Sequence, residues 1–308
     1  MSGEDDIVLN KVVIFGVGLI GGSFARALKK AGAVRSIVGM DRSPAYLARA
    51  LELGIVDVSG DSSDAGLTEA LRGADLVLLA TPVAQTEKIL AALAPNLEAG
   101  TVVTDAGSTK ADVVVAARRA LGGKIAQFVP GHPIAGRETN GPDAAIDSLY
   151  AGKKVVLTAL DENAAGDLER VASAWRACGA IIHHLSPQEH DKVFAAVSHL
   201  PHLLAYALVD DIANKPHADL LFQYAASGFR DFTRIAGSSP EMWRDISLAN
   251  QPALLAELDA YLAQLTGLRE RLAAGDGAAL ERVYSNAQRA RHQWITAIEA
   301  AEAPPSQE

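Results

Sequence analysis

The segment GHPIAGRETNG, residues 131–141, places one histidine between a glycine and a proline and runs on into an Arg-Glu pair. Glycine and proline interrupt the segment and no apolar period crosses it, so we expect neither helix nor strand there. Histidine titrates near neutral pH, so it can take the proton of an alcohol hydroxyl while hydride leaves the carbon that bears this hydroxyl. His132 is therefore a candidate general base. A loop histidine bonded only to a backbone carbonyl has the same spacing, and both interpretations stay open at this point.

A glycine-rich turn lies near the start of the chain, in VVIFGVGLIGGS. Gly16, Gly18 and Gly21 form a G-x-G-x-x-G pattern between an apolar run and a helical one, which is the context of a dinucleotide-binding turn. The first glycine permits a tight bend, the second lets the backbone approach a pyrophosphate, and the third lets helix and strand pack closely. We expect the amides at the helix start, at Leu19 and Ile20, to bind the phosphates.

The residues that follow the next apolar runs belong to the same predicted site. Asp41 in IVGMDRS is expected to bind ribose hydroxyls and to repel a 2′-phosphate, which favours NAD, whereas Arg42 beside it makes NADP the alternative. Carboxyl ends of parallel strands collect ligands at one edge of a sheet. The positions expected at this edge, besides His132 after IAQFVP, are Thr81, Pro82, Gly107 and Ser108.

Two polar groups stand out in the second half of the chain. In EHDKVFAAVSHLPH an α-helix would place Asp191, Ser198 and His202 on one face, with His199 one residue to the side. A metal site is not expected there, because Pro201 separates the histidines and no cysteine or facing carboxylate is present.

The other group is the arginine pair of GFRDFTRIA, where Arg230, Asp231 and Arg234 fall within about one helical turn. They are either a surface ion pair of little energetic value or a source of an arginine fork that binds a substrate carboxylate.

Apolar β-branched runs alternate with alanine-rich helical stretches through the first half, which predicts an α/β Rossmann-type doubly wound parallel sheet. We expect this sheet to continue to about residue 185, with strands at 11–18, 36–41, 74–82, 100–107, 153–160 and 179–185. After Ser186 and Pro187 the chain is almost free of strand patterns. The predicted organisation is a dinucleotide-binding domain at 8–185, an all-α substrate and dimerisation domain at 186–300, and a flexible tail at 301–308.

The helical half ends in an apolar seam with alternating spacings of four and three residues, which is a heptad pattern. A break at AAGDGAA and a second apolar series predict an αα-hairpin. A small helical domain cannot bury so long a stripe alone, so we expect a homodimer. The seam residues are Leu254, Leu258, Tyr261, Leu265, Leu268 and Leu272 on the first helix and Leu280, Val283, Ala287, Ala290 and Trp294 on the second.

Composition narrows the classes of partner. The formal net charge of −9 argues against nucleic acid, which needs a basic face. We find no 18-residue apolar run and an acidic N-terminus unlike a signal peptide, so no membrane partner is expected. Cys178 is the single cysteine, which is compatible with a reducing cytoplasm. A small-molecule substrate and a cytoplasmic location are the expectation.

Taken in order, GVGLIGGS, VVTDAGSTK, GHPIAGRE, HDKVFAAVSHLPH and GFRDFTRIA resemble the prephenate and arogenate dehydrogenases of tyrosine biosynthesis, whose broad-specificity members are the cyclohexadienyl dehydrogenases. The resemblance covers about residues 10–300. It implies NAD(P)-dependent oxidation of prephenate to 4-hydroxyphenylpyruvate, or of arogenate to tyrosine, with loss of carbon dioxide. It also implies a Rossmann domain followed by a helical dimerisation domain.

The resemblance assigns roles to matching residues. His132 would polarise the ring 4-hydroxyl, Ser108 would share that hydroxyl, and Arg234 would bind a substrate carboxylate. His202, with His199 beside it, would lie near the substrate side chain, and Glu138 would gate the site. Arg137 and Asn140 replace smaller or different residues of relatives, so substrate preference is expected to depend on this stretch. No chorismate mutase segment precedes the Rossmann domain, so a bifunctional enzyme is not expected.

Two other functions fit part of the pattern. A β-hydroxyacid dehydrogenase shares the Rossmann-plus-helices plan, but it would use a lysine on the first long helix, where this chain offers Lys192 among several histidines. A regulator that senses NAD without turnover would not need His132, Ser108 and Arg234 together.

Overall fold

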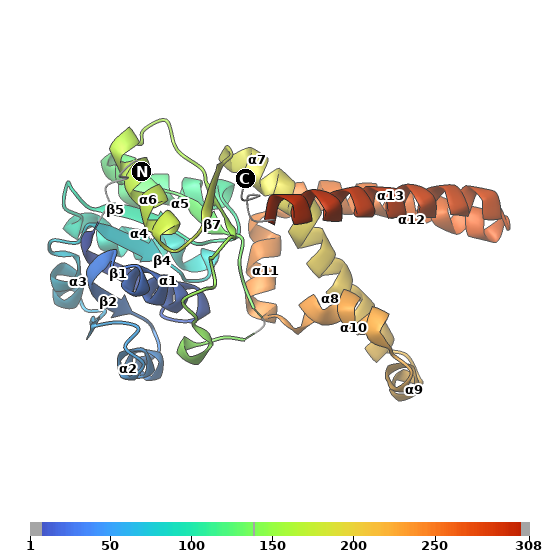
Figure 1. Ribbon diagram of the computed structural model, residues 1–308, viewed down its shortest axis with the longest axis horizontal. Coiled ribbons are helices and arrows are strands. Elements are labelled where there is room, and N and C mark those ends of the chain that lie inside the picture. Colours follow the sequence, from blue (N-terminus) through green and yellow to red (C-terminus); the bar gives the residue numbers. More distant parts are fainter. Residues whose placement is uncertain (1–7, 138, 303–308) are drawn as a thin grey trace, which may run out of the picture. The chain divides into compact units, whose positions relative to one another are not determined.

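The computed structural model describes residues 8–137 and 139–302. The chain divides into a compact unit that ends at Leu254 and a second unit that begins at Leu255. The first unit contains both sheets and all helices up to α11, and the second contains most of the two long C-terminal helices. Figure 1 shows the elements in sequence colours.

The main sheet of the first unit is parallel throughout. The strand order changes direction between β1 and β4, and open α/β sheets bind ligands at such a switch point. The predicted doubly wound sheet is therefore confirmed. Its strands, in spatial order, are β3 (Val58–Ser59), β2 (Val34–Met40), β1 (Leu9–Phe15), β4 (Leu76–Leu79), β5 (Val102–Asp105) and β6 (Phe128–Val129).

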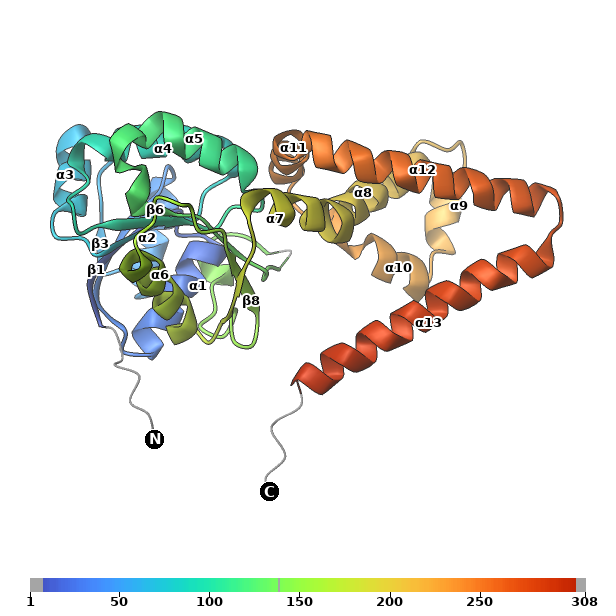
Figure 2. The ribbon, with the colours of Figure 1, turned by 90° about the horizontal axis from the view of Figure 1, so that it is seen from above.

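Alternate residues of β1 enter two separate cores. Val12 and Ile14 are buried on one face of the sheet with α1 (Leu19–Lys30) and α6 (Ala165–Ala177). Val13 and Phe15 are buried on the other face, with helices that lie together along one side of the molecule in Figure 2. Burial on both faces explains why Val12 to Phe15 of β1 are apolar at four successive positions. The helices of this second face are α3 (Asp64–Leu71), α4 (Thr86–Leu93) and α5 (Ala111–Leu121).

Three strands that follow form a sheet of their own, β7 (Gly131–Pro133), β8 (Lys154–Leu157) and β9 (Ile181–His184). The expectation of one sheet that continues to residue 185 is wrong in this respect. The expectation of a loop at His132 is also wrong, because β7 pairs antiparallel with β8 and sets His132 opposite Val156. Strand pairing with a distant segment is not encoded in the local glycine and proline pattern.

Short helices connect these strands. Pro44 is at the first turn of α2 (Pro44–Glu52), and Ser43 caps it by accepting a hydrogen bond from the amide of Tyr46. Four 3-10 helices also lie between the strands, η1 (Val83–Gln85), η2 (Ala94–Asn96), η3 (Gly122–Gln127) and η4 (Pro142–Ala144).

A continuous helical run of 27 residues from Pro187 to Ala213 leaves the second sheet. It consists of α7 (Pro187–Phe194), the π-helical turn η5 (Ala195–His199) and α8 (Leu200–Ala213). The wider π turn changes the phase of the helix, so the prediction of one shared face for Asp191, Ser198 and His202 is wrong. By length and mean hydropathy the run could cross a membrane, but Asp191 is buried and bonded to the start of α5.

Six elements complete the helical part of the described residues. The first unit continues through α9 (Ala218–Gln223), α10 (Ser227–Thr233), η6 (Arg234–Gly237) and α11 (Pro240–Ala249). The second unit consists of α12 from Leu255 onward and α13, whose full bounds are Gln251–Ala273 and Gly277–Glu302. The predicted break between two long helices is confirmed, but the helices diverge from their turn (Figure 2). Several seam residues stay exposed, among them Leu265, Leu272 and Trp294.

Candidate active site

The three glycines of the turn after β1 meet different surroundings. Gly16 has a φ of +91°, and a side chain there would overlap the carbonyl oxygen of Ala80. A side chain at Gly21 would overlap the carbonyl oxygen of Gly16. At Gly18 a Cβ would meet only the amide nitrogen of Gly141, at 3.9 Å. Gly18 is also the N-cap of α1 and makes no side-chain cap, so open space lies beside the amides of Leu19 and Ile20, where an anion is stabilised.

The acidic residue at the end of β2 is held by backbone amides. Asp41 Oδ2 accepts from the amide of Val17 at 3.0 Å, and Oδ1 accepts from the amide of Ser43 at 2.9 Å. Each carboxylate oxygen has a further lone pair for a ribose hydroxyl. Arg42 is exposed. The carboxylate therefore faces the turn, as a dinucleotide site requires.

The end of β4 supplies another polar group to this edge. Thr81 Oγ1 is buried and has no hydrogen-bond partner among the described residues, and Thr81 Cγ2 lies beside Gly16. Pro82 is exposed. A buried hydroxyl without a partner is costly, so this atom is suited to a ligand. The glycine cradle, the fixed Asp41 and the Thr81 hydroxyl together fit a dinucleotide.

A buried ion pair shapes the loop that carries Ser108. Lys110 is fully buried and its Nζ contacts Asp105 Oδ2. The same Asp105 carboxylate accepts from the amide of Gly107 at 2.8 Å and from the amide of Gly131 at 3.1 Å. One carboxylate thus connects the loop that holds Ser108 to the strand that holds His132. Ser108 itself is half-buried.

His132 is the first member of a chain of side chains that the sequence pattern did not reveal. Its Nδ1 lies 2.8 Å from Nε2 of His190, and Nδ1 of His190 lies 2.8 Å from Oδ1 of Asp191. Asp191 in turn accepts from the amides of Lys110 and Ala111, each at 2.8 Å. The dipeptide His190-Asp191 was visible in the sequence, but its contact with His132 depends on how α7 meets β7.

Burial and hydrogen bonds determine the protonation states of His132, His190 and Asp191. It lowers the pKa of His132 well below the ordinary value, and the charges of His190 and Lys110 lower it further. It also lowers the pKa of His190, against the opposing effect of Asp191. Burial alone would raise the pKa of Asp191, but hydrogen bonds from His190 and from the amides of Ala111 and Lys110 keep it below the usual value. At neutral pH the imidazoles are neutral and the carboxylate is charged.

The two histidines of SHLPH have different roles in packing. His199 is buried, its Nδ1 accepts from Asn250 Nδ2 at 3.1 Å, and burial lowers its pKa to about 4. Asn250 Nδ2 also donates to the backbone oxygen of Asp191 at 2.7 Å, which joins α11 to the histidine chain. His202 stacks on Trp243 with ring centroids 3.5 Å apart.

Arg234 begins η6, next to α8. Burial lowers the pKa of His202, and the positive charge of Arg234 lowers it further, which places the guanidinium within electrostatic reach of that imidazole. Arg137 is exposed in the segment after β7, and Glu138 lies outside the described residues. The structure therefore joins His132, His190 and Asp191 by hydrogen-bond contacts. It places Arg234 on η6, which packs against α8, the helix that contains His202.

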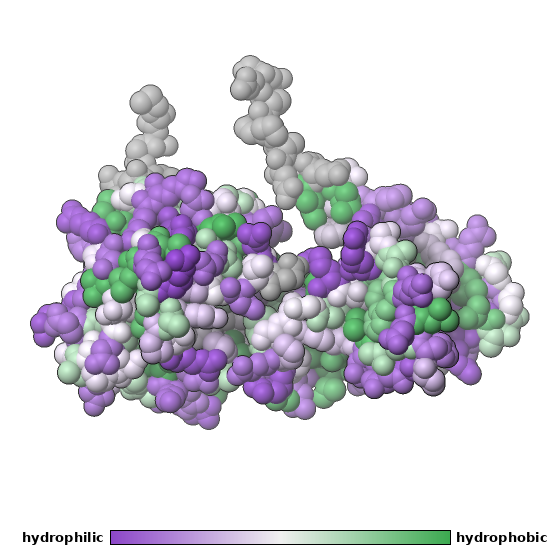
Figure 3. All heavy atoms as spheres, turned by 90° about the horizontal axis from the view of Figure 1, so that it is seen from below, coloured by the Kyte–Doolittle hydropathy of each residue, from purple (hydrophilic) through white to green (hydrophobic). Residues whose placement is uncertain are grey.

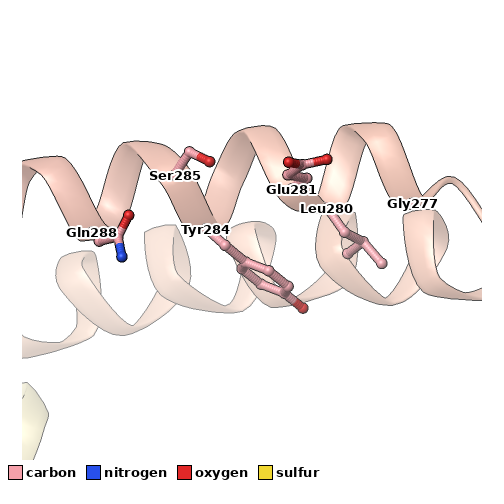
Figure 4. Close-up of a pocket in the computed structure, with 6 residues that line it drawn as sticks. All are labelled: Gly277, Leu280, Glu281, Tyr284, Ser285 and Gln288. Atoms are coloured by element: carbon pink, nitrogen blue, oxygen red, sulfur yellow. The ribbon is translucent and has the colours of Figure 1, made fainter.

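Two hollows on α13 are lined by none of these residues. One of about 530 Å³ follows a single face of α13, where Tyr284 and Leu280 project beside Gln288 (Figure 4). Its lining comes from one helix only, so it has no second wall to enclose a small molecule. Among the described residues no group of three histidine, cysteine or acidic side chains is placed to hold a metal ion.

Comparison with protein families finds two matches along the chain. Residues 24–184 match the nucleotide-binding domain of prephenate dehydrogenase. Residues 186–286 match the dimerization domain of prephenate dehydrogenase. Together the two matches cover most of the chain and include Asp41, His132 and Arg234, whereas the glycine turn precedes the first match.

Individual proteins are similar over most of their length. A cyclohexadienyl dehydrogenase of Zymomonas mobilis is 38% identical, over 92% of this chain and 96% of the relative. A prephenate dehydrogenase of Bacillus subtilis is 37% identical, over 90% of this chain and 74% of the relative. The crystal structure of Aquifex aeolicus prephenate dehydrogenase with hydroxyphenyl propionate and NAD+ has a TM-score of 0.87 and 37% identity, and covers 93% of this chain and 99% of that one.

Proposed function

Because the chain belongs to the prephenate dehydrogenase family, we propose that it catalyses the NAD-dependent oxidative decarboxylation of prephenate to 4-hydroxyphenylpyruvate, of arogenate to tyrosine, or of both. One observation of the structure carries the proposal beyond family membership. His132 is held by a chain of buried side chains and joined through Asp105 to the loop after β5, at the sheet edge where ligands gather.

NAD is the proposed cofactor. Bound there, it would accept hydride from C4 of the substrate at its nicotinamide. Gly18 and the amides of Leu19 and Ile20 would hold the pyrophosphate, and Asp41 would hold the adenosine ribose. The exposed Arg42 keeps NADP as the second cofactor to test.

The chemistry of His132 follows from atom balance. The substrate 4-hydroxyl gives its proton to Nε2 of His132 as the C4–H bond breaks and hydride leaves. The ring carboxylate then departs as carbon dioxide, and the electron pair of the broken C–C bond makes the ring aromatic. The oxygen that becomes phenolate takes the proton back from Nε2, so His132 acts first as base and then as acid. Ser108 would share the same hydroxyl.

The helical part would bind the remainder of the substrate. Arg234 offers two parallel N–H donors, which suit a carboxylate. The neutral His202, stacked on Trp243, would lie near the substrate side chain, with His199 behind it. Arg137 and Glu138 would set the preference between prephenate, which has a keto acid side chain, and arogenate, which has an amino acid side chain.

We also propose a homodimer and a domain boundary at 185/186. The two family matches meet at this boundary, and the second is to a dimerization domain. Large apolar side chains are exposed along the helices, including Tyr224, Leu272 and Trp294, and hydrophobic patches interrupt the polar surface in Figure 3. A second copy would cover them. Size-exclusion chromatography with light scattering should give twice the chain mass of 32.2 kDa.

Cys178 is buried and forms no disulfide, which fits a cytoplasmic location, and we include this location in the proposal. A β-hydroxyacid dehydrogenase is the second candidate function. It would need Lys192 in the site, and Lys192 is exposed. We therefore favour decarboxylation.

The test is an assay of prephenate and arogenate, each with NAD and with NADP. We expect turnover with NAD and at least one of the two substrates, and a higher kcat/KM with NAD than with NADP. Absence of turnover in all four combinations would refute the proposed function, and a higher kcat/KM with NADP would refute the role given to Asp41.

A further inference from the structure

The hydrogen-bond chain behind His132 has a direction that can be derived from its ends. Asp191 accepts bonds from the amides of Lys110 and Ala111, and these amides can only donate. A carboxylate that is ionised has no proton of its own, so the 2.8 Å contact with His190 requires Nδ1 of His190 to be the donor.

The next link follows from the first. A neutral imidazole carries one N–H, and that of His190 is on Nδ1. Its Nε2 is therefore an acceptor, and the 2.8 Å contact with Nδ1 of His132 requires His132 to carry its proton on Nδ1. The lone pair of neutral His132 is then on Nε2. Which nitrogen holds the proton is set by the partner of the other nitrogen.

We propose that His190 and Asp191 are positioning residues that hold His132 as the Nδ1–H tautomer, with Nε2 as the proton acceptor of the reaction. The proposal rests on the proposed function for its catalytic consequence, but the tautomer itself is a property of the protein without substrate. The free imidazole of histidine prefers no such orientation, so without His190 the ring could present either nitrogen to the hydroxyl.

The packing around His190 favours a positioning role toward His132 over a merely structural one. His190 is fully buried, and its ring packs against Phe194 with centroids 4.5 Å apart. Phe194 also contacts the ring of His132, at a centroid distance of 4.9 Å, so both imidazoles are restricted in plane as well as in hydrogen bonding. Restriction of this kind is what positions a base for proton transfer.

Titratable groups from α5, β5 and η5 face the hydrogen-bonded series of His132, His190 and Asp191. Lys110, at the start of α5, lowers the pKa of both imidazoles, and Asp105 of β5 and Asp191 oppose this at His190. His199 of η5 adds a smaller effect at His132. Because Lys110 is paired with Asp105, Asp191 is the carboxylate placed to balance positive charge when His132 takes a proton.

The experiment combines a spectrum with kinetics. Nitrogen-15 NMR of the wild-type protein, labelled at histidine, should show His132 protonated at Nδ1 and unprotonated at Nε2. His190→Leu removes the acceptor, so the His132 signal should lose this pattern and kcat should fall roughly 10- to 100-fold, the range seen when groups that orient a ligating or reacting histidine are removed. KM for substrate and the Kd for NAD should change little.

His190→Gln supplies a side-chain oxygen that can accept from Nδ1 of His132, so it should restore the Nδ1–H pattern and most of kcat. His183→Leu is the matched control, because His183 is exposed on β9, and its kcat should equal that of the wild type. If His190→Leu fails to fold, the wild-type spectrum and His190→Gln still decide.

An Nε2–H tautomer of His132 in the wild type would overturn the proposal, and so would an unchanged kcat in His190→Leu. Failure of the proposed function would look different: the wild type would have no turnover, while the NMR pattern would remain. A kcat loss in His190→Leu that His190→Gln does not rescue, with the tautomer unchanged, would assign His190 a structural role and would also reject the proposal.

Discussion

The cofactor edge, which is the glycine turn after β1 with Asp41, and the histidine chain, which is the hydrogen-bonded series His132, His190 and Asp191, are built from different chemical groups. At the cofactor edge, glycines and backbone amides from one short turn leave space and donors for a ligand, and Asp41 is held by two amides. At His132, side chains from β7 and α7 form the site, and the amides at the start of α5 fix its far end. A site made of backbone depends on a few positions without side chains, whereas a chain of side chains depends on every member.

The largest expected effect is at the histidine end of this comparison. His132→Asn removes the proton acceptor and should lower kcat roughly 10²- to 10⁴-fold, with KM changed only slightly. Steady-state kinetics measures both, with His183→Asn as the control for an exposed histidine. A kcat within tenfold of the wild type would mean that His132 is only a bonded histidine of the strand.

Acid should lower the free energy of unfolding, mainly through buried imidazoles such as that of His199 and not through the cofactor edge. Unfolded histidine binds its proton near pH 6.5, whereas burial lowers the pKa of folded His199 to about 4. Between these values the unfolded state holds more protons, so the free energy of unfolding falls as the pH falls from 6.5 to 4. His199 alone should contribute about 3 kcal/mol. Urea unfolding across this range measures it, and a flat profile would contradict the burial of these imidazoles.

Loss of Arg234, which we propose binds a substrate carboxylate, should have a smaller effect than loss of His132, the proposed base. Arg234→Gln removes a charged donor worth about 1.5–3 kcal/mol, so KM should rise roughly 10- to 100-fold while kcat stays close to that of the wild type. Arg230→Gln is the matched control, since Arg230 is exposed on α10. Equal KM values for the two variants would reduce Arg234 to part of a surface ion pair.

The smallest expected effect is at the cofactor edge, where one methyl group is added. Gly18→Ala has space for its Cβ, so the melting temperature should hold while the Kd for NAD rises roughly tenfold, a loss of about 1.4 kcal/mol. Gly21→Ala should instead lower stability, because its Cβ overlaps the carbonyl of Gly16. Gly123→Ala, with open space around it, is the control. A Gly18→Ala protein that binds NAD normally would mean that the pyrophosphate does not approach this glycine.

The same contrast explains what the sequence could and could not predict. The parallel sheet, the glycine turn and the break between α12 and α13 depend on local residue patterns, and each is found where predicted. The pairing of β7 with β8 and the contact of His190 with His132 depend on segments that meet only in the folded chain.

The π turn at η5 marks a further limit of local patterns. Its sequence, AAVSH, contains no residue that is incompatible with an α-helix, yet the π turn changes which side chains of α7 and α8 share a face. The α-helical pattern therefore predicts one face for Asp191, Ser198 and His202, whereas Asp191 accepts a hydrogen bond at the start of α5. Hydrogen-bond donors for a buried carboxylate such as Asp191 come from tertiary packing, which periodicity does not describe.

The central claim is that oxidation of the substrate ring alcohol, with His132 as the base, is coupled to decarboxylation. The stoichiometry of the products tests this claim most directly. Prephenate labelled in its ring carboxylate, with NAD and the wild-type protein, should release labelled carbon dioxide and NADH in equal amounts, together with 4-hydroxyphenylpyruvate. Arogenate treated in the same way should give tyrosine if it is the preferred substrate. Formation of NADH from either substrate without release of carbon dioxide would contradict the claim and would indicate a simple hydroxyacid dehydrogenase.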